Sequence, residues 1–232
     1  MKHVILCDFD GTITTYDITN TLCQMHIPDR WAEIERMWES RQISATECYE
    51  LEYEALAFRK GEIDAFVATL DISPGLDRLL EVVRMKGWEF HIVSAGFDYY
   101  IESVLGRHGI YLPYTANGLR FTPDGRPQFH FLTQDDPTCT RLKHPCSGCK
   151  PESWRLWKAK GYQVTYIGDG ATDFCMADHF KNSATPGDLL FAKKRLLVYC
   201  REQAIPAVPF DTLYDVAAYL AHLAEPEETL PL

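Results

Sequence analysis

The chain has 232 residues, of which 46% are hydrophobic and 24% are charged, with a formal net charge of −10. This length is enough for one domain with a sizeable insertion or for two small domains, and the acidic balance argues against a nucleic-acid partner. Because the sequence shows no signal-peptide pattern and no run long enough to cross a bilayer, we expect a cytoplasmic protein without a membrane contact.

Five short apolar segments without strict alternation of polar and apolar residues predict buried parallel strands. In chain order they are residues 3–8, 90–94, 164–168, 189–192 and 207–210. Helical patterns lie between and after them, at residues 74–87, 99–107, 151–160, 173–180, 193–203 and 211–223. This alternation predicts an α/β fold, with a doubly wound parallel sheet covered by helices on both faces.

Two stretches interrupt the alternation. Residues 17–70 carry helical periodicity without a strand pattern and are far longer than an ordinary connection. We therefore predict a small helical cap at 17–70 that acts as a lid, inserted into a core formed by residues 1–16 and 71–232. We expect the aromatic residues of the cap to form mostly its own small core, while one or two could face the cleft and select an apolar substrate tail; they are Trp31, Trp38, Tyr49, Tyr53 and Phe58. At 111–131, a Pro-Asp-Gly turn between Phe- and Leu-rich runs predicts a β-hairpin.

The pentad Asp8-Phe9-Asp10-Gly11-Thr12 follows the first apolar segment. Side chains two residues apart on a strand share a face, so Asp8 and Asp10 would repel each other unless a cation or a proton lies between them. Gly11 and Thr12 turn the chain and offer backbone N–H groups to an anion. This arrangement suits attack by one carboxylate on a phosphoryl group, with a divalent cation holding both and the second carboxylate moving a proton. An acidic turn after a strand is the simpler alternative.

Two later segments could bind a phosphate group. Ser94-Ala95-Gly96 ends the second predicted strand, where a hydroxyl and backbone N–H groups can hold phosphate oxygens, although the same tripeptide is also a common turn. Lys150 stands at a predicted helix start, where its ammonium could neutralise the phosphate and the attacking carboxylate. A solvated lysine is the alternative.

Two further carboxylates, Asp169 and Asp173, follow the third predicted strand. A hard cation binds several oxygens, and Asp169 with Asp8 and the Asp10 carbonyl would supply three. Because the carboxyl ends of parallel strands open onto one crevice, we expect all of these groups to meet there.

Taken in order, Asp-x-Asp-Gly-Thr, a strand-end Ser, a Lys and Gly-Asp-x-x-x-Asp resemble the haloacid dehalogenase superfamily of phosphatases. The cap predicted after the first motif is similar to that of the phosphoserine-phosphatase-like branch. The resemblance implies a Rossmann-like core, a phosphoric monoester hydrolase activity and a small phosphorylated metabolite as substrate, in a monomer or homodimer.

The resemblance also implies roles for individual residues. Asp8 would be the nucleophile that forms an aspartyl-phosphate, and Asp10 the general acid and then the general base. Ser94 and Lys150 would hold the phosphoryl group.

The same resemblance implies Mg²⁺ as cofactor. Asp8, the Asp10 carbonyl and Asp169 would bind it, and Asp173 would support them directly or through water.

Within this branch the chain most resembles the methionine-salvage phosphatases that act on 2-hydroxy-3-keto-5-methylthiopentenyl-1-phosphate. The matching segments are 8–14 with Asp17, 94–98, 149–151, 191–192 and 200–203. The alternatives are a phosphatase for phosphoserine or another small monoester, a phosphotransferase, and a catalytically silent regulatory binding protein.

Asp17 stands where phosphoserine phosphatases carry a carboxylate that holds the substrate amine, but it could equally cap a helix. Around residues 49–56 there is no arginine to bind a substrate carboxylate, which counts against phosphoserine.

Cys139, His144, Cys146 and Cys149 form a separate cluster before Lys150. A Cys-x-x-Cys pair is the usual half of a zinc site, so the cluster could bind a second metal. Free thiols or a reversible redox pair are the alternatives.

Overall fold

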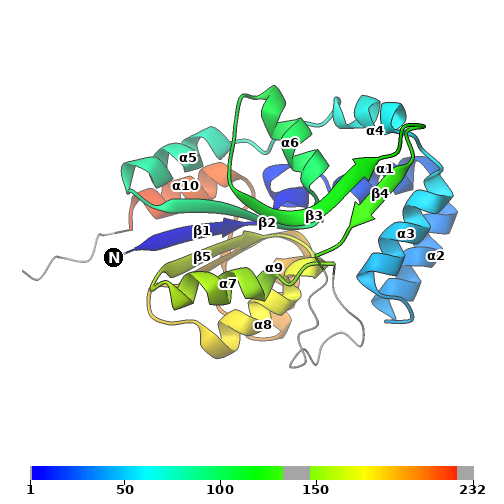
Figure 1. The fold of residues 1–232 in the computed structure, drawn as a ribbon. Helices are drawn as coiled ribbons and strands as arrows, with labels where there is room; N and C mark the ends of the chain where they lie inside the picture. Colours follow the sequence, from blue (N-terminus) through cyan, green and yellow to red (C-terminus); the bar gives the residue numbers. More distant parts are fainter. Residues whose placement is uncertain (1, 133–146, 224–232) are drawn as a thin grey trace, which may run out of the picture.

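The computed structural model describes residues 2–132 and 147–223, and within them seven strands form one sheet in the order β4-β3-β2-β1-β5-β6-β7 (Figure 1). The strands are β1 His3–Cys7, β2 Glu89–Phe97, β3 Tyr114–Phe121, β4 Pro127–His130, β5 Gln163–Gly168, β6 Leu189–Ala192 and β7 Val208–Pro209. Only β4 runs antiparallel to its neighbour. The predicted doubly wound α/β fold is confirmed.

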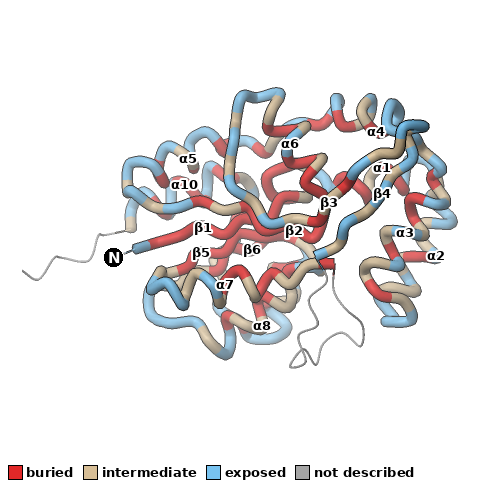
Figure 2. The backbone as a smooth tube through the Cα atoms, in the orientation of Figure 1, coloured by how far each residue is buried: buried red, intermediate tan, exposed pale blue. Residues whose placement is uncertain are grey.

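Helices cover both faces of the sheet. The helical segments are η1 Phe9–Ile13, α1 Ile18–His26, α2 Pro28–Glu39, α3 Ala45–Leu56, α4 Lys60–Val67, α5 Leu76–Met85, α6 Asp98–Arg107, α7 Lys150–Ala159, η2 Ala171–Asp173, α8 Phe174–Ser183, α9 Lys194–Glu202 and α10 Leu213–Ala221. Alternate residues of β1 enter opposite cores: Ile5 packs with α5, α6 and α10, whereas Val4 and Leu6 pack with α7, α8 and α9. Burial on both faces explains why β1 reads as a continuous apolar run (Figure 2).

The alternative that Ser94-Ala95-Gly96 forms a turn is excluded. The three residues lie within β2, which runs on to Phe97 with a break in its register to β3 between Val93 and Phe97. The pairing of β2 with β1 ends at Ile92, and its pairing with β3 resumes at Phe97. The predicted hairpin is present as β3 and β4, and β3 joins the main sheet beside β2.

Helices α1–α4, called the helical insertion below, lie between η1 and α5, and α2 and α3 stand at one end of the sheet beside the β3–β4 hairpin (Figure 1). The prediction of an internal aromatic core holds for Trp31 and Phe58, which pack with Leu22 and Leu56. The division of the chain into a 17–70 cap and a core stays a prediction.

Two aromatic residues of α3, Tyr49 and Tyr53, pack outside that internal core, and Tyr49 also lines the cleft. The ring of Tyr49 lies 5.0 Å from that of Phe97, and the ring of Tyr53 lies 5.0 Å from that of Phe129. A single sequence gave no sign that the hairpin reaches α3. These contacts join the helical insertion to the sheet.

No helix in the described ranges combines the length and the apolar character that a membrane crossing requires.

Candidate active site

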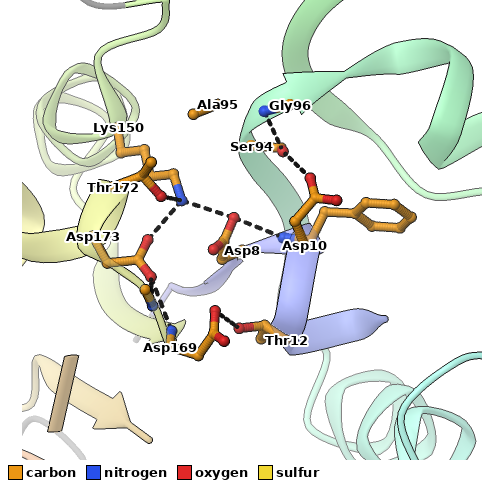
Figure 3. A network of polar contacts seen from close by, with 12 residues as sticks. Asp8, Asp10, Thr12, Ser94, Ala95, Gly96, Lys150, Asp169, Thr172 and Asp173 are labelled. Carbon is orange, nitrogen blue, oxygen red and sulfur yellow. Dashed lines mark hydrogen bonds and ion pairs between the residues drawn. The ribbon is translucent and has the colours of Figure 1, made fainter. Parts of the chain in front are cut away.

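Polar side chains meet at the carboxyl ends of three neighbouring strands. Asp8 follows β1, Ser94 lies near the end of β2, and Asp169 follows β5. Figure 3 shows these side chains around one space, with Lys150 at the start of α7 beside them. The structure thus brings together groups that are up to 161 positions apart (169 − 8) in the sequence.

Lys150 is the central cation of this site. Its Nζ lies 2.7 Å from Asp8 Oδ1 and 2.6 Å from Asp173 Oδ1, and its side chain is 2% exposed. The interpretation as a solvated lysine is therefore excluded. Burial lowers the pKa of Lys150, but the carboxylates of Asp173 and Asp8 outweigh burial and raise the pKa above its usual value. The ammonium stays charged and holds both carboxylates.

Asp173 has both carboxylate oxygens occupied. Oδ1 accepts from Lys150 and from the hydroxyl of Tyr166, and Oδ2 accepts from the backbone N–H groups of Asp169 and Gly170, each at 2.9 Å. A fully buried carboxylate with four donors is fixed in place. Asp173 therefore orients Lys150 and the 169–170 turn.

Asp10 lines the same cleft as Asp8 but makes a different set of contacts. Strand β1 ends at Cys7, so the two-residue repeat stops before Asp8. Asp10 instead accepts from the Ile18 N–H at 3.2 Å and from the Ser94 hydroxyl at 3.3 Å.

The surroundings of Asp10 favour its protonated form. Burial and then the charge of Asp17 raise its pKa to about 7. A Cβ at Gly96 would lie 2.4 Å from Asp10 Oδ2, so glycine is required there for the close approach of β2. Such a carboxyl can give and take a proton near neutral pH.

Asp8, Asp169 and Asp173 offer carboxylate oxygens within 4.8 Å of one another. Burial, followed by the charge of Asp173, raises the pKa of both Asp8 and Asp169. Three buried carboxylates beside the Lys150 ammonium leave negative charge that a divalent cation would neutralise, and all-oxygen ligands suit Mg²⁺. The residues present therefore fit a magnesium ion. The contribution of the Asp10 carbonyl stays a prediction.

Thr12 and Gly11 support the same cluster. The buried Thr12 hydroxyl donates to Asp169 Oδ1 at 3.3 Å, so it faces the carboxylates, and its predicted role as a phosphate ligand stays untested. Gly11 has φ +72°, and a Cβ there would lie 2.4 Å from Asp169 Oδ2. Both the turn and the approach of Asp169 require glycine at this position.

A cleft opens from these groups toward the helical insertion. The sheet contributes one wall, including Asp8, Asp10, Ser94 and Ala95. The insertion contributes the other wall, made by Asp17, Asn20, Glu35, Trp38 and Tyr49. A small molecule in this cleft would contact both parts of the chain.

Residues 5–178 match the family model for haloacid dehalogenase-like hydrolases. The chain belongs to this family. It is therefore a hydrolase. The family predicted from the order of the sequence motifs is confirmed.

This haloacid dehalogenase-like hydrolase is similar to two proteins named 2-hydroxy-3-keto-5-methylthiopentenyl-1-phosphate phosphatase. The one from an Exiguobacterium species is 26% identical, over 95% of this chain and 98% of the relative. The one from Microcystis aeruginosa is 28% identical, over 95% and 98%. In fold, the hydrolase is similar to a phosphoserine phosphatase solved as a phospho-aspartyl intermediate analogue, with a TM-score of 0.66, 16% identity and coverage of 94% and 98%.

The interpretation of Asp17 as a helix cap is confirmed. Its carboxylate caps α1 by accepting the N–H of Asn20 at 2.9 Å, and it also lines the cleft. Burial raises its pKa. A substrate-binding role stays a prediction.

Sequence reasoning missed two basic residues of the hydrolase site. Lys194 Nζ lies 2.9 Å from Asp169 Oδ2 and 3.2 Å from the Gly11 carbonyl oxygen. Arg195 lines the cleft and forms a 2.8 Å ion pair with Glu39 of α2. Both follow β6, so the strand-end argument used for Asp169 could have found them.

Of the predicted second-metal cluster, Cys139, His144 and Cys146 lie outside the described residues. Cys149 directly precedes α7 and is partly buried.

Proposed function

We propose that the protein is a magnesium-dependent phosphatase that hydrolyses a small phosphomonoester through an aspartyl-phosphate on Asp8. The observation that carries this proposal is the buried contact of Lys150 with Asp8, beside the Asp10–Ser94 pair at the cleft. A nucleophile, a phosphate-neutralising ammonium and a separate proton donor are then within one site.

In the first step, a carboxylate oxygen of Asp8 attacks phosphorus while the ester P–O bond breaks. Asp8 Oδ1 is held by Lys150 and by the Phe9 N–H at 2.8 Å, whereas Oδ2 accepts no hydrogen bond from residues 2–132 or 147–223. Oδ2 is therefore the oxygen we assign to the attack. Asp10 donates its proton to the leaving oxygen, so an alcohol departs.

In the second step, Asp10 accepts a proton from water, and the resulting oxygen attacks the phosphorus of the aspartyl-phosphate. The bond from phosphorus to Asp8 breaks and inorganic phosphate leaves. We assign the binding of the phosphate oxygens to Ser94 and the backbone N–H of Ala95, because both residues line the cleft.

Asp8, the Asp10 carbonyl and Asp169 would hold Mg²⁺, with Asp173 fixing their surroundings. When bound, the ion neutralises charge on the carboxylates and on the phosphoryl oxygens.

We further propose that residues 17–70 act as a cap, whose closure excludes water during phosphoryl transfer. The cleft wall formed by Asp17, Glu35, Trp38 and Tyr49 supports this assignment. The ion pair between Glu39 and Arg195 spans the two parts, but both side chains are about half exposed, so it holds the cap only weakly.

For the substrate we propose 2-hydroxy-3-keto-5-methylthiopentenyl-1-phosphate. The names of the relatives and the segments shared with methionine-salvage phosphatases support it. Phosphoserine is the second candidate, because Arg195 supplies at the cleft the arginine that is missing from residues 49–56.

Phosphate release from both esters, compared by kcat/KM, tests the choice between the two substrates. A preference for phosphoserine would overturn the first substrate, and no turnover of any small phosphomonoester would overturn the phosphatase.

The pH dependence should report the protonation of Asp10. We expect kcat/KM to fall as pH rises through the pKa of Asp10, since the first step uses the protonated carboxyl. The midpoint should lie at or below about 7, because a cation beside Asp8 favours the ionised form. Asp10→Asn should remove this limb and lower kcat by about 10²–10⁴-fold.

Asp17→Asn serves as the matched variant in these pH–rate profiles. Removing its charge should move the midpoint to lower pH, since that charge raises the pKa of Asp10. A profile whose alkaline limb survives Asp10→Asn would show that another group titrates.

Removal of divalent cations should abolish turnover, and added Mg²⁺ should restore it. Asp169→Asn should raise the Mg²⁺ concentration for half-maximal activity at least about tenfold, because it removes one charged oxygen ligand. The control is Asp77→Asn, which alters an exposed carboxylate on α5. Full activity of the wild type in EDTA would contradict the assigned magnesium site.

A further inference from the structure

A second group of metal-ligating side chains lies inside the helical insertion. Glu35 comes from α2, and Cys48 and Glu52 lie one turn apart on the facing side of α3. Their ligand atoms all lie within 4.8 Å of one another. The group is separate from Asp8, Asp169 and Asp173.

Cys48 and Glu52 are buried, and Glu35 is partly buried. Glu52 is 2% exposed, and its Oε1 atom has no hydrogen-bond partner among residues 2–132 and 147–223. Cys48 is 7% exposed, and its thiol makes a long contact of 3.9 Å with Glu35 Oε1. Neither glutamate forms an ion pair with a basic side chain in the described part of the chain. An unpaired carboxylate is costly at such a depth, and a bound cation would remove this cost.

We propose that Glu35, Cys48 and Glu52 bind a zinc ion between α2 and α3. One thiolate and two carboxylates match zinc, which accepts sulfur and oxygen ligands, whereas magnesium prefers oxygen alone. Ligands at about 2.0–2.3 Å from a common zinc ion stand about 3.5 Å apart, so binding would draw these side chains together by roughly 1 Å.

The position of Glu35 gives the ion a route and a fourth ligand. Glu35 also lines the cleft, so the ion enters from the solvent there and keeps one position for water. The same ion fixes the α3 turn that carries Tyr49, a residue of the cleft wall. The site thus stabilises the wall that faces the substrate, independently of the catalytic assignment made above.

Cobalt(II) bound to the full-length protein tests the site, because a cobalt–thiolate bond gives a charge-transfer absorption band. Excess Mg²⁺ is kept present to saturate the all-oxygen cluster. We expect one equivalent of cobalt to give the band in the wild type and in Cys23→Ser, whose thiol lies on the neighbouring helix α1 and is not among the proposed ligands. Cys48→Ser should lose the band.

Two further variants keep the outcome unambiguous. A chain with Cys139, Cys146 and Cys149 all changed to Ser should retain the cobalt–thiolate band. If this triple variant lost the band while Cys48→Ser kept it, the proposal would be overturned. Zinc should also raise the unfolding temperature of the wild type, and the near-isosteric Glu52→Gln should weaken zinc affinity at least about tenfold. If zinc left the unfolding temperature of the wild type unchanged, the three groups would be protonated side chains and not a metal site.

Discussion

Replacing Asp8 by asparagine is expected to lower kcat by at least about 10⁴-fold, which is the scale measured when an enzyme loses its nucleophile. The amide has nearly the same shape as the carboxylate, so its oxygen can still accept the N–H of Phe9. It cannot form the covalent phosphoryl intermediate, however, and binding by Lys150 and Ser94 alone does not break the ester bond. Phosphate release from the preferred ester, measured at saturating Mg²⁺, gives the comparison.

The Asp8→Asn result is informative only if the variant is folded. Asp77→Asn, on the far exposed side of α5, should keep wild-type kcat and serves as the matched control. Rapid quenching of the wild type with labelled substrate should trap phosphate on the protein, and the Asp8→Asn protein should trap none. A folded Asp8→Asn protein that retained more than a hundredth of wild-type kcat would exclude Asp8 as the nucleophile.

The sequence predicted those parts of the fold and site that follow from strand patterns. Apolar runs located β1, β5 and β6, because a strand buried on both faces excludes polar residues. The rule that parallel strand ends meet at one edge then grouped Asp8 with Asp169. The burial of Lys150 did not follow from any local pattern, since it depends on Asp8 and Asp173 converging from different strands.

The errors arose where tertiary pairing overrode local signals. Ser94-Ala95-Gly96 has residues that are common in turns, yet it continues β2 to Phe97. Strand β1 ends at Cys7, so the two-residue repeat of a strand does not decide where Asp8 and Asp10 lie. The sequence also offered no means to see that Phe129 of the hairpin would contact Tyr53 of α3, since the register of a hairpin against a distant helix is set by the assembled fold.

Lys150→Met should abolish turnover and destabilise the protein. The substitution leaves Asp8 and Asp173 buried without their shared ammonium, and breaking a buried ion pair from one side costs about 3–5 kcal/mol. Burial and the charge of Asp173 already raise the pKa of Asp8 in the folded state, and loss of the ammonium raises this pKa further. Such a group stabilises the fold at acidic pH and loses that contribution as pH rises. The deficit in unfolding free energy relative to the wild type should therefore widen toward alkaline pH, and Mg²⁺ should narrow it.

Lys158→Met is the control that distinguishes the loss of the Lys150 ammonium from the loss of an ion pair to a buried carboxylate elsewhere in the protein. Lys158 lies on the same helix, α7, and pairs at 2.9 Å with the buried Asp188, outside the cleft. We expect Lys158→Met to lower stability but to leave the kcat of the folded protein near that of the wild type, and Mg²⁺ should not restore its stability. Denaturant unfolding at several pH values, with Mg²⁺ or EDTA, measures both variants. If Mg²⁺ stabilised them equally, the Lys150 ammonium and the cation would not act on the same carboxylates, and the charge balance assigned to Asp8, Asp169 and Asp173 would be wrong.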